Sequence, residues 1–177
     1  MRKLEQLLMA TLGAGLTFAC ATHSPKPAAE NSVELLIKRS QESNTALMRG
    51  DIERYSSLLT IADDFSFMSP FGGAPTHGAP KGERLQRIGQ FFKNGTHEQE
   101  LVQAYGSDDL VVLALIERSR VEVGGLPSQD WALRVTLVYR RDGSDWTLVH
   151  RHADPLVERI SLPHAATLAR GERPEGG

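Results

Sequence analysis

The sequence predicts an α+β fold: a cone-shaped, curved antiparallel sheet wrapped on about three N-terminal helices. Apolar residues follow helical spacing through most of the chain as far as Phe92. From His97 to Ala153 the pattern is that of long strands rich in β-branched and apolar residues. Turn signals at Gly124-Gly125 and Asp142-Gly143 join the last strands into an antiparallel meander. Helices followed by a run of strands are typical of α+β domains.

The composition is that of one ordinary globular domain. The chain has 177 residues, of which 40% are hydrophobic and 24% charged, so it is long enough for one core and short for two. The formal net charge is −2, and no block of basic residues interleaved with aromatic ones occurs. We therefore expect no nucleic acid among its partners.

Residues 1–21 are expected to be an export signal. A positively charged start precedes a mostly apolar run, Leu7 to Ala19, which is too short to span a bilayer comfortably. Two endings stay open: cleavage after Ala21 at an Ala-x-Ala site, or a lipoprotein box that makes Cys20 the lipidated first residue. We expect export to the periplasm or cell envelope of a bacterium, with membrane contact only if Cys20 is lipidated. A single cysteine excludes an intramolecular disulfide.

The first helices follow a short linker. Residues 22–30 contain two prolines and small residues, which is typical of an exposed linker. Asn31, with Glu34 three residues later, predicts a capped helix start. The helix is expected to end at Gly50 in a left-handed conformation, and Asp51 to cap a second, short helix.

The middle of the chain alternates between breakers and short elements. Residues 64–70 predict a short strand, and 71–82 a loop rich in proline and glycine of the length that often covers a binding site. Residues 82–92 return to helical spacing. Asn94-Gly95 predicts a turn, which would leave His97 on the surface.

Four strands and a short terminal helix complete the prediction. The strands are expected at 97–105, 109–123, 129–141 and 145–153. The continuous apolar run of the second strand predicts that both of its faces are covered in the middle. The segment 159–177 is expected to hold a short helix and a flexible tail.

Four segments taken together resemble the nuclear transport factor 2-like superfamily, in its SnoaL-like branch. They are Met48–Asp51, Phe67–Gly73, Arg134–Gly143 and Trp146–Asp154. The resemblance covers about Val33 to Glu158, so we place the domain at 31–158. It implies a cystatin-like roll with a hydrophobic pocket for a small apolar ligand, and frequent homodimers. The catalytic sets of its relatives ketosteroid isomerase, limonene epoxide hydrolase and scytalone dehydratase do not map onto this chain residue by residue.

His150 and His152 are the leading candidates for catalytic residues. On a regular strand they share one face with Trp146 and Leu148, and Asp154 is next in line. Imidazole titrates near neutral pH, so either histidine suits a general acid or base. The alternative is that both are hydrogen-bonded elements of the inner face of the sheet.

Arg134 is the third predicted catalytic residue. It shares a strand face with Thr136, which we expect to contact substrate, and its guanidinium suits the binding of a carboxylate or enolate. The alternative is a cross-strand salt bridge to Glu117 or Glu122.

Met68, Phe71 and Asp154 complete the predicted substrate-binding residues. The first two flank the loop after the first strand and could line the mouth of the cavity, although plain core packing explains them equally well. Asp154 also stands in a His-x-His-x-Asp run that could hold a metal. Pro155 stands where the metallo-β-lactamase pattern has a further histidine, so we predict no metal site.

The functional prediction is an exported SnoaL-like protein that binds a small apolar molecule. Any reaction would be acid-base chemistry of the isomerase, dehydratase or cyclase type, carried by His152 or His150 with Arg134 holding an anion. The sequence has no glycine-rich phosphate loop and no nucleophile elbow, so no cofactor is expected. The alternatives are a non-catalytic binding or dimerisation module and a membrane-tethered lipoprotein.

Overall fold

The computed structural model describes residues 27–171, with side chains from Glu30 onward. The predicted signal 1–21, Cys20, the linker before Pro27 and the last residues of the tail lie outside the described residues. Export and lipidation therefore stay predictions from the sequence. Of the helices in the described range, none has the length and apolar character needed to cross a membrane.

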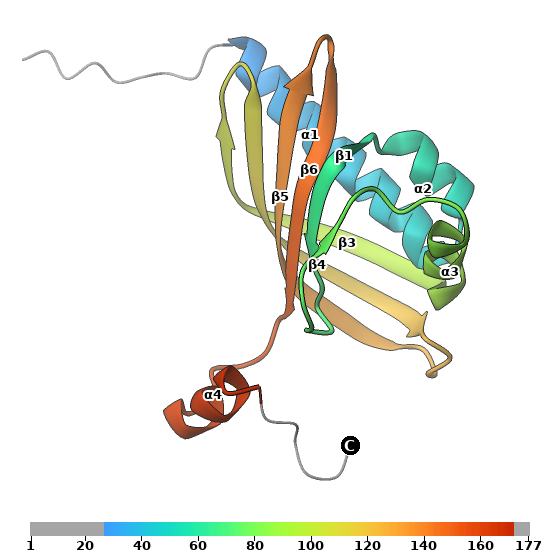
Figure 1. Cartoon of the computed structure of the whole chain (residues 1–177), viewed down its shortest axis with the longest axis vertical. Coiled ribbons are helices and arrows are strands. Elements are labelled where there is room, and N and C mark those ends of the chain that lie inside the picture. The colour runs from blue at the N-terminus through green and yellow to red at the C-terminus, as the bar shows by residue number, and fades with distance from the viewer. Residues whose placement is uncertain (1–26, 172–177) are drawn as a thin grey trace, which may run out of the picture.

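The described residues form four helices and one six-stranded sheet, which confirms the predicted α+β fold (Figure 1). The sheet has the strand order β2-β1-β6-β5-β4-β3. Helices α1, α2 and α3 cover one side of the curved sheet, here called its helix-facing side, and α4 lies apart from it (Figure 1). The helices are α1 (Pro27–Arg49), α2 (Ile52–Leu58), α3 (Glu83–Phe91) and α4 (Leu162–Ala169), and the strands are β1 (Ile61–Met68), β2 (Thr76–His77), β3 (Phe92–Gly106), β4 (Leu110–Val123), β5 (Gln129–Asp142) and β6 (Asp145–Pro155).

Helix α1 begins earlier than the sequence predicts. It is already helical at Pro27, so the predicted cap at Asn31 is wrong and the expected linker is partly helix. Its other end is as predicted: Gly50 has a φ of 81°, a conformation that suits glycine. A Cβ on Gly50 would also lie 3.0 Å from the carbonyl oxygen of Phe92. Asp51 then caps α2 by accepting a hydrogen bond from the backbone of Arg54.

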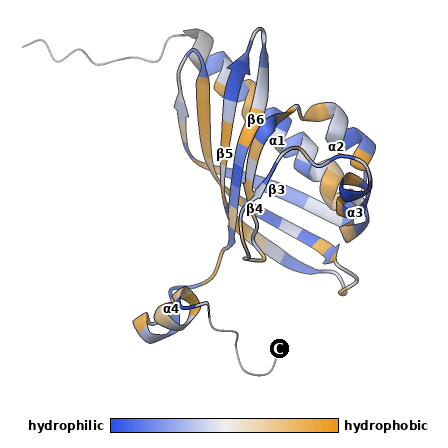
Figure 2. Ribbon diagram, in the orientation of Figure 1, coloured by the Kyte–Doolittle hydropathy of each residue, from blue (hydrophilic) through white to orange (hydrophobic). Residues whose placement is uncertain are grey.

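The sheet is mixed rather than wholly antiparallel. Strands β4, β5 and β6 form the predicted antiparallel meander, but β1 pairs with β6 in parallel. The two-residue strand β2 lies inside the predicted loop and pairs with β1. The long strands carry apolar residues interspersed with polar ones (Figure 2), as expected where only one face of a sheet is covered.

A bulge replaces the turn predicted at Asn94-Gly95. Strand β3 continues through this position without a turn, but its pairing with β4 shifts by one residue between Lys93 and Thr96. Asn94 takes a left-handed φ of 54°, which asparagine tolerates better than most residues, and such a residue can serve a bulge as well as a turn. The strand therefore turns His97 toward the helices, where it is buried, and the prediction of a surface residue is wrong.

A second bulge lies in β6 and changes the phase of the strand. Tyr139 pairs with Leu148, whereas the preceding Val138 pairs with His150, so Val149 is an extra residue. Because alternation has a period of two, one extra residue exchanges the two faces for the rest of the strand. Leu148 faces the helices, but His150 does not.

The main core lies between α1 and the helix-facing side of the sheet. It includes Leu36, Phe65, Val111, Leu113, Leu115, Val135, Leu137, Tyr139, Trp146 and Leu148. On the other face of β4, here called the outer face of the sheet, Val112, Ala114 and Ile116 are only half-buried. Within one chain, then, only one face of this strand is covered, because the helices pack on one side only, and the expectation that both faces are covered by the domain itself is wrong.

Candidate functional site

A cavity of about 390 Å³ opens between the three N-terminal helices and the helix-facing side of the sheet. This volume falls in the range of about 300–1,000 Å³ typical of ligand pockets. Its wall is mainly apolar, with side chains from α1, α3, β1, β5 and β6. The aromatic residues that line the cavity are Tyr55, Phe65, Phe67, Phe71, Phe91, Phe92 and Trp131.

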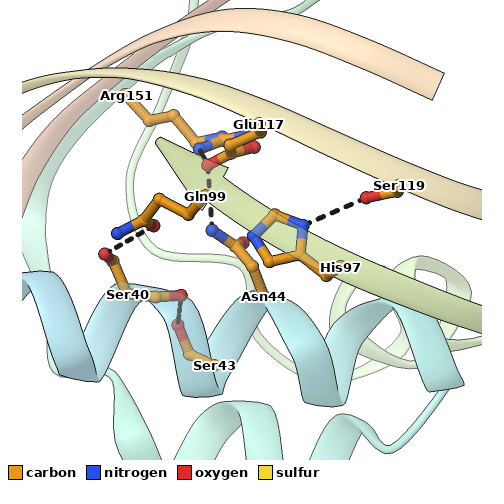
Figure 3. A network of polar contacts seen from close by, with 8 residues as sticks. All are labelled: Ser40, Ser43, Asn44, His97, Gln99, Glu117, Ser119 and Arg151. Carbon is orange, nitrogen blue, oxygen red and sulfur yellow. Dashed lines mark hydrogen bonds and ion pairs between the residues drawn. The ribbon is translucent and has the colours of Figure 1, made fainter. Parts of the chain in front are cut away.

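The floor of the cavity holds a buried ion pair. Arg151 Nη1 and Nη2 donate hydrogen bonds to Glu117 Oε1 and Oε2 over 2.9 and 2.7 Å. Asn44 Nδ2, from α1, donates a third hydrogen bond to Oε1 over 2.9 Å (Figure 3). The side chains of Glu117 and Arg151 are 5% and 19% exposed, so a helix and two strands are joined by one charged network.

Both members of this pair are charged at neutral pH. Burial would raise the pKa of Glu117, but the adjacent Arg151 and the hydrogen bond from Asn44 outweigh it and hold the pKa below its ordinary value. Burial would lower the pKa of Arg151, and Glu117 raises it above its usual range. Burial raises the pKa of Tyr55, whose phenol lines the cavity and stays protonated.

His97 and Ser119 form a second polar pair beside the floor. His97 Nδ1 lies 3.0 Å from Ser119 Oγ (Figure 3), and Ser119 lines the cavity. Burial lowers the pKa of His97, an effect that the charge of Glu117 partly offsets, so the ring is neutral at pH 7. Its Nε2 is buried without a hydrogen-bond partner in the described structure. His97 therefore reaches the cavity only through the hydroxyl of Ser119.

The mouth of the cavity combines aromatic and cationic side chains. Phe71, from the loop after β1, lies 5.5 Å from the ring of Phe91 and 5.5 Å from that of Trp131, measured between centroids. Arg84 and Arg87 of α3 also line the cavity. Phe71, predicted to bind substrate, thus lines the cavity, and its role in binding stays a prediction.

The predicted catalytic residues lie on the outer face of the sheet. His150 Nδ1 is 2.7 Å from Ser66 Oγ. His152 Nε2 lies 3.4 Å from Asp154 Oδ1, and Arg134 Nη2 lies 3.8 Å from Asp154 Oδ2. The structure thus brings His152, Arg134 and Asp154 together, but none of them lines the cavity. For His150, His152 and Asp154 the bulge at Val149 is the reason, because it turns the even-numbered residues that follow it away from the helices. Arg134, on β5, faces outward by ordinary alternation, since its neighbours Leu133 and Val135 are buried in the core.

Thr136 and Met68, predicted to bind substrate, also lie on the outer face of the sheet and do not line the cavity. Both pair in register with His152, from β5 and β1, and Met68 is exposed. Arg134 lies beside Asp154 instead of Glu117 or Glu122, the two salt-bridge partners considered from sequence. Glu117 faces the helices and binds Arg151, and Glu122 accepts a hydrogen bond from Asn94. Among residues 27–171, no group of three His, Cys, Asp or Glu side chains is arranged to hold a metal ion.

Sequence reasoning missed the polar residues of the cavity. Glu117 directly follows the apolar run Leu110–Ile116, and an acidic residue at an inward position of such a strand requires a partner. Regular alternation, which places His150 and His152 beside Leu148, places Arg151 on the opposite face, whereas the bulge in β6 turns it toward the cavity. His97 and Ser119 had no distinguishing pattern, since their contact spans two strands and depends on the bulge in β3.

Comparison with known families matches residues 39–158 to the model of the SnoaL-like domain. Comparison with curated protein sequences gives no significant match. The family match includes strands β3 and β6 and all of the polar residues of the cavity floor.

Solved structures share the fold at low sequence identity. A nuclear transport factor 2-like superfamily protein from Salmonella enterica matches with a TM-score of 0.58 at 14% identity, over 76% of this chain and 98% of that one. An NTF2-like protein from Cytophaga hutchinsonii matches with a TM-score of 0.55 at 15% identity, over 71% and 99% of the two chains. The association domain of CaMKII from C. elegans matches with a TM-score of 0.54 at 13% identity, over 73% and 99%. At these identities the likeness concerns the fold alone.

The buried ion pair gives a prediction about stability. Glu117→Leu should lower the free energy of unfolding by about 3–5 kcal/mol, because it leaves the charge of Arg151 buried without a partner. Glu117→Leu combined with Arg151→Met should lower the free energy of unfolding by less than Glu117→Leu alone, because no unpaired charge is then buried. Urea unfolding of the variants measures both. Glu100→Gln, which breaks an exposed pair with Arg118, is the control and should lower the free energy of unfolding by less than about 1 kcal/mol. The prediction would be contradicted if the loss in the double variant equalled the sum of the losses in its two single variants.

The lowered pKa of His97 gives a prediction about pH. An unfolded histidine takes up a proton near about pH 6.5, whereas buried His97 resists it. The stability is therefore complete above that value and falls as the pH drops through the lower, folded-state pKa. His97→Gln should flatten this loss of stability below about pH 6.5 in urea unfolding. His77→Gln, at an exposed residue of β2, should keep the wild-type slope. Equal slopes for all three proteins would refute the prediction.

Proposed function

Because the chain belongs to the SnoaL-like domain family of the nuclear transport factor 2-like superfamily, we propose that it binds a small, mainly apolar molecule in its cavity. The observation that carries the proposal is the mainly apolar cavity of about 390 Å³ with a polar floor. An apolar wall supplies affinity by burying the ligand, and a few polar groups fix its orientation. This agrees with the ligand class predicted from the sequence.

The floor suits binding better than acid-base catalysis. Glu117 already accepts three hydrogen bonds, from Arg151 and Asn44, on its two carboxylate oxygens, and its lowered pKa makes it a weak base. His97 is separated from the cavity by Ser119. The histidines predicted to be catalytic lie on the opposite face of the sheet. We therefore propose a binding protein, with the donors of Arg151 and the hydroxyl groups of Ser119 and Tyr55 turned toward an oxygen atom of the ligand.

Filling the cavity tests the proposal. Ile88 is half-buried and lines the cavity from α3, so Ile88→Trp should occupy the space that the ligand needs. The uncharged fluorophore N-phenyl-1-naphthylamine should bind the native protein with a rise in emission. The variant should bind it roughly tenfold or more weakly, through steric exclusion.

The matched control lies on the same helix. Gln86 is exposed and does not line the cavity, so Gln86→Trp adds the same side chain without filling the space and should leave binding unchanged. Equal binding by both variants, with native circular dichroism, would mean that the fluorophore binds elsewhere. That result would refute the cavity as the binding site.

We also propose that the protein forms a homodimer through the outer face of the sheet. Half-buried Val112, Ala114, Ile116 and Val138 form an apolar strip there, and the neighbouring Tyr105 is 62% exposed. Contiguous exposed apolar residues on a soluble protein are typical of an interaction surface. An association domain among the similar structures makes self-association a reasonable use of this fold.

A charge placed on this strip tests the dimer. Val112→Glu should convert the dimer to a monomer, because association would bury an unpaired carboxylate. Size-exclusion chromatography with light scattering measures the mass. Lys38→Glu, on the exposed side of α1, is the control and should leave the dimer intact. A monomeric native protein at concentrations near 100 μM (about −5.5 kcal/mol in affinity) would rule the dimer out.

A further inference from the structure

We propose that the ligand is an apolar acid whose carboxylate is held at the mouth of the cavity by Arg84 and Arg87. Its apolar body would then lie inside, against the aromatic wall. This inference rests on the proposed function and adds the chemical class of the ligand.

The charges lining the cavity favour an anion. The charged side chains that line it are Arg84, Arg87, Arg151 and Glu117. Glu117 is bound on both oxygens by Arg151, so these two cancel and the arginines of α3 are left. A cavity with low-dielectric walls and an excess of positive charge attracts anions and strengthens their binding.

The mouth suits a carboxylate better than the floor does. A carboxylate placed beside Arg151 would meet the like charge of Glu117 in a poorly solvated space, which is unfavourable. The spare donors of Arg151 suit an uncharged oxygen instead. At the mouth, no other acidic residue lines the cavity among the described residues, and guanidinium groups match carboxylates in geometry as well as charge.

One face of α3 presents both kinds of contact. Arg84, Arg87, Ile88 and Phe91 all line the cavity, at the three- and four-residue spacings that place side chains on one side of a helix. The cationic pair occupies the first part of the helix and the apolar pair the second. An amphipathic ligand matches this order, with its acid end toward Arg84 and its apolar end toward Phe91.

Arg84 and Arg87 each make one contact with a neighbouring side chain and keep further donors for a ligand. Arg84 is half-buried and its Nη2 donates a hydrogen bond to Thr76 Oγ1 over 3.0 Å, which orients the guanidinium and leaves its other donors. Arg87 Nη1 lies 3.9 Å from Glu83 Oε2, and both side chains are highly exposed. Such a pair is worth little in water, so a ligand carboxylate can replace it.

Two probes of the same shape test the charge. Isothermal titration calorimetry compares 1-naphthoate, an anion at pH 7, with the uncharged 1-naphthamide. We expect the native protein to bind naphthoate about tenfold more tightly than the amide, as one charge-assisted contact provides. Arg84→Gln combined with Arg87→Gln should remove that preference, because it should weaken the binding of naphthoate much more than that of naphthamide. Arg87→Gln alone, at an exposed side chain, should reduce the preference if the double variant does not fold.

The control and the outcomes separate this inference from the proposed function. Arg118→Gln, at an exposed residue of β4 outside the cavity, should keep the native preference for naphthoate. Equal affinity of the native protein for both probes, or a preference that survives in the arginine variants, would overturn the acid and leave the binding cavity standing. Failure of both probes and of N-phenyl-1-naphthylamine to bind would overturn the acid and the cavity together.

Discussion

The buried contact between Glu117 and Arg151 is the interaction on which the cavity depends. Two charges withdrawn from water are tolerated only when each satisfies the other and the remaining lone pairs are hydrogen-bonded. Arg151 and Asn44 meet that condition by binding both carboxylate oxygens. Because the three residues come from β4, β6 and α1, the requirement fixes the distance between the helix and the sheet. The space beyond the pair can therefore stay open without loss of the fold.

Two bulges decide which side chains reach that space. In β3 the bulge at Asn94 and Gly95 brings His97 under α1, and in β6 the bulge at Val149 brings Arg151 to the helix-facing side. A straight β6 would have placed the neighbouring histidines in the cavity and the arginine outside. One additional residue in a strand thus changes the chemistry of the pocket, since neighbouring positions on a strand face opposite sides.

The resulting cavity has three zones with different chemistry. The floor is an internally neutralised ion pair with spare hydrogen-bond donors, the wall is apolar and aromatic, and the mouth carries Arg84 and Arg87. This gradient from neutral polar to apolar to cationic suits an elongated amphipathic ligand better than a compact polar one. The cluster of His152, Arg134 and Asp154 lies instead beside the apolar strip of the outer face, where it would border a dimer contact rather than a pocket.

The sequence by itself determined the class of fold, the meander of the last three strands, the end of α1 at Gly50 and the start of α2 after Asp51. These features follow from local patterns: apolar spacing, turn residues and caps act over a few neighbouring positions. The parallel pairing of β1 with β6, the burial of His97 and the inward face of Arg151 were decided only by the tertiary structure. Each depends on the register between strands distant in sequence, and a one-residue bulge that changes the register leaves no distinct local pattern.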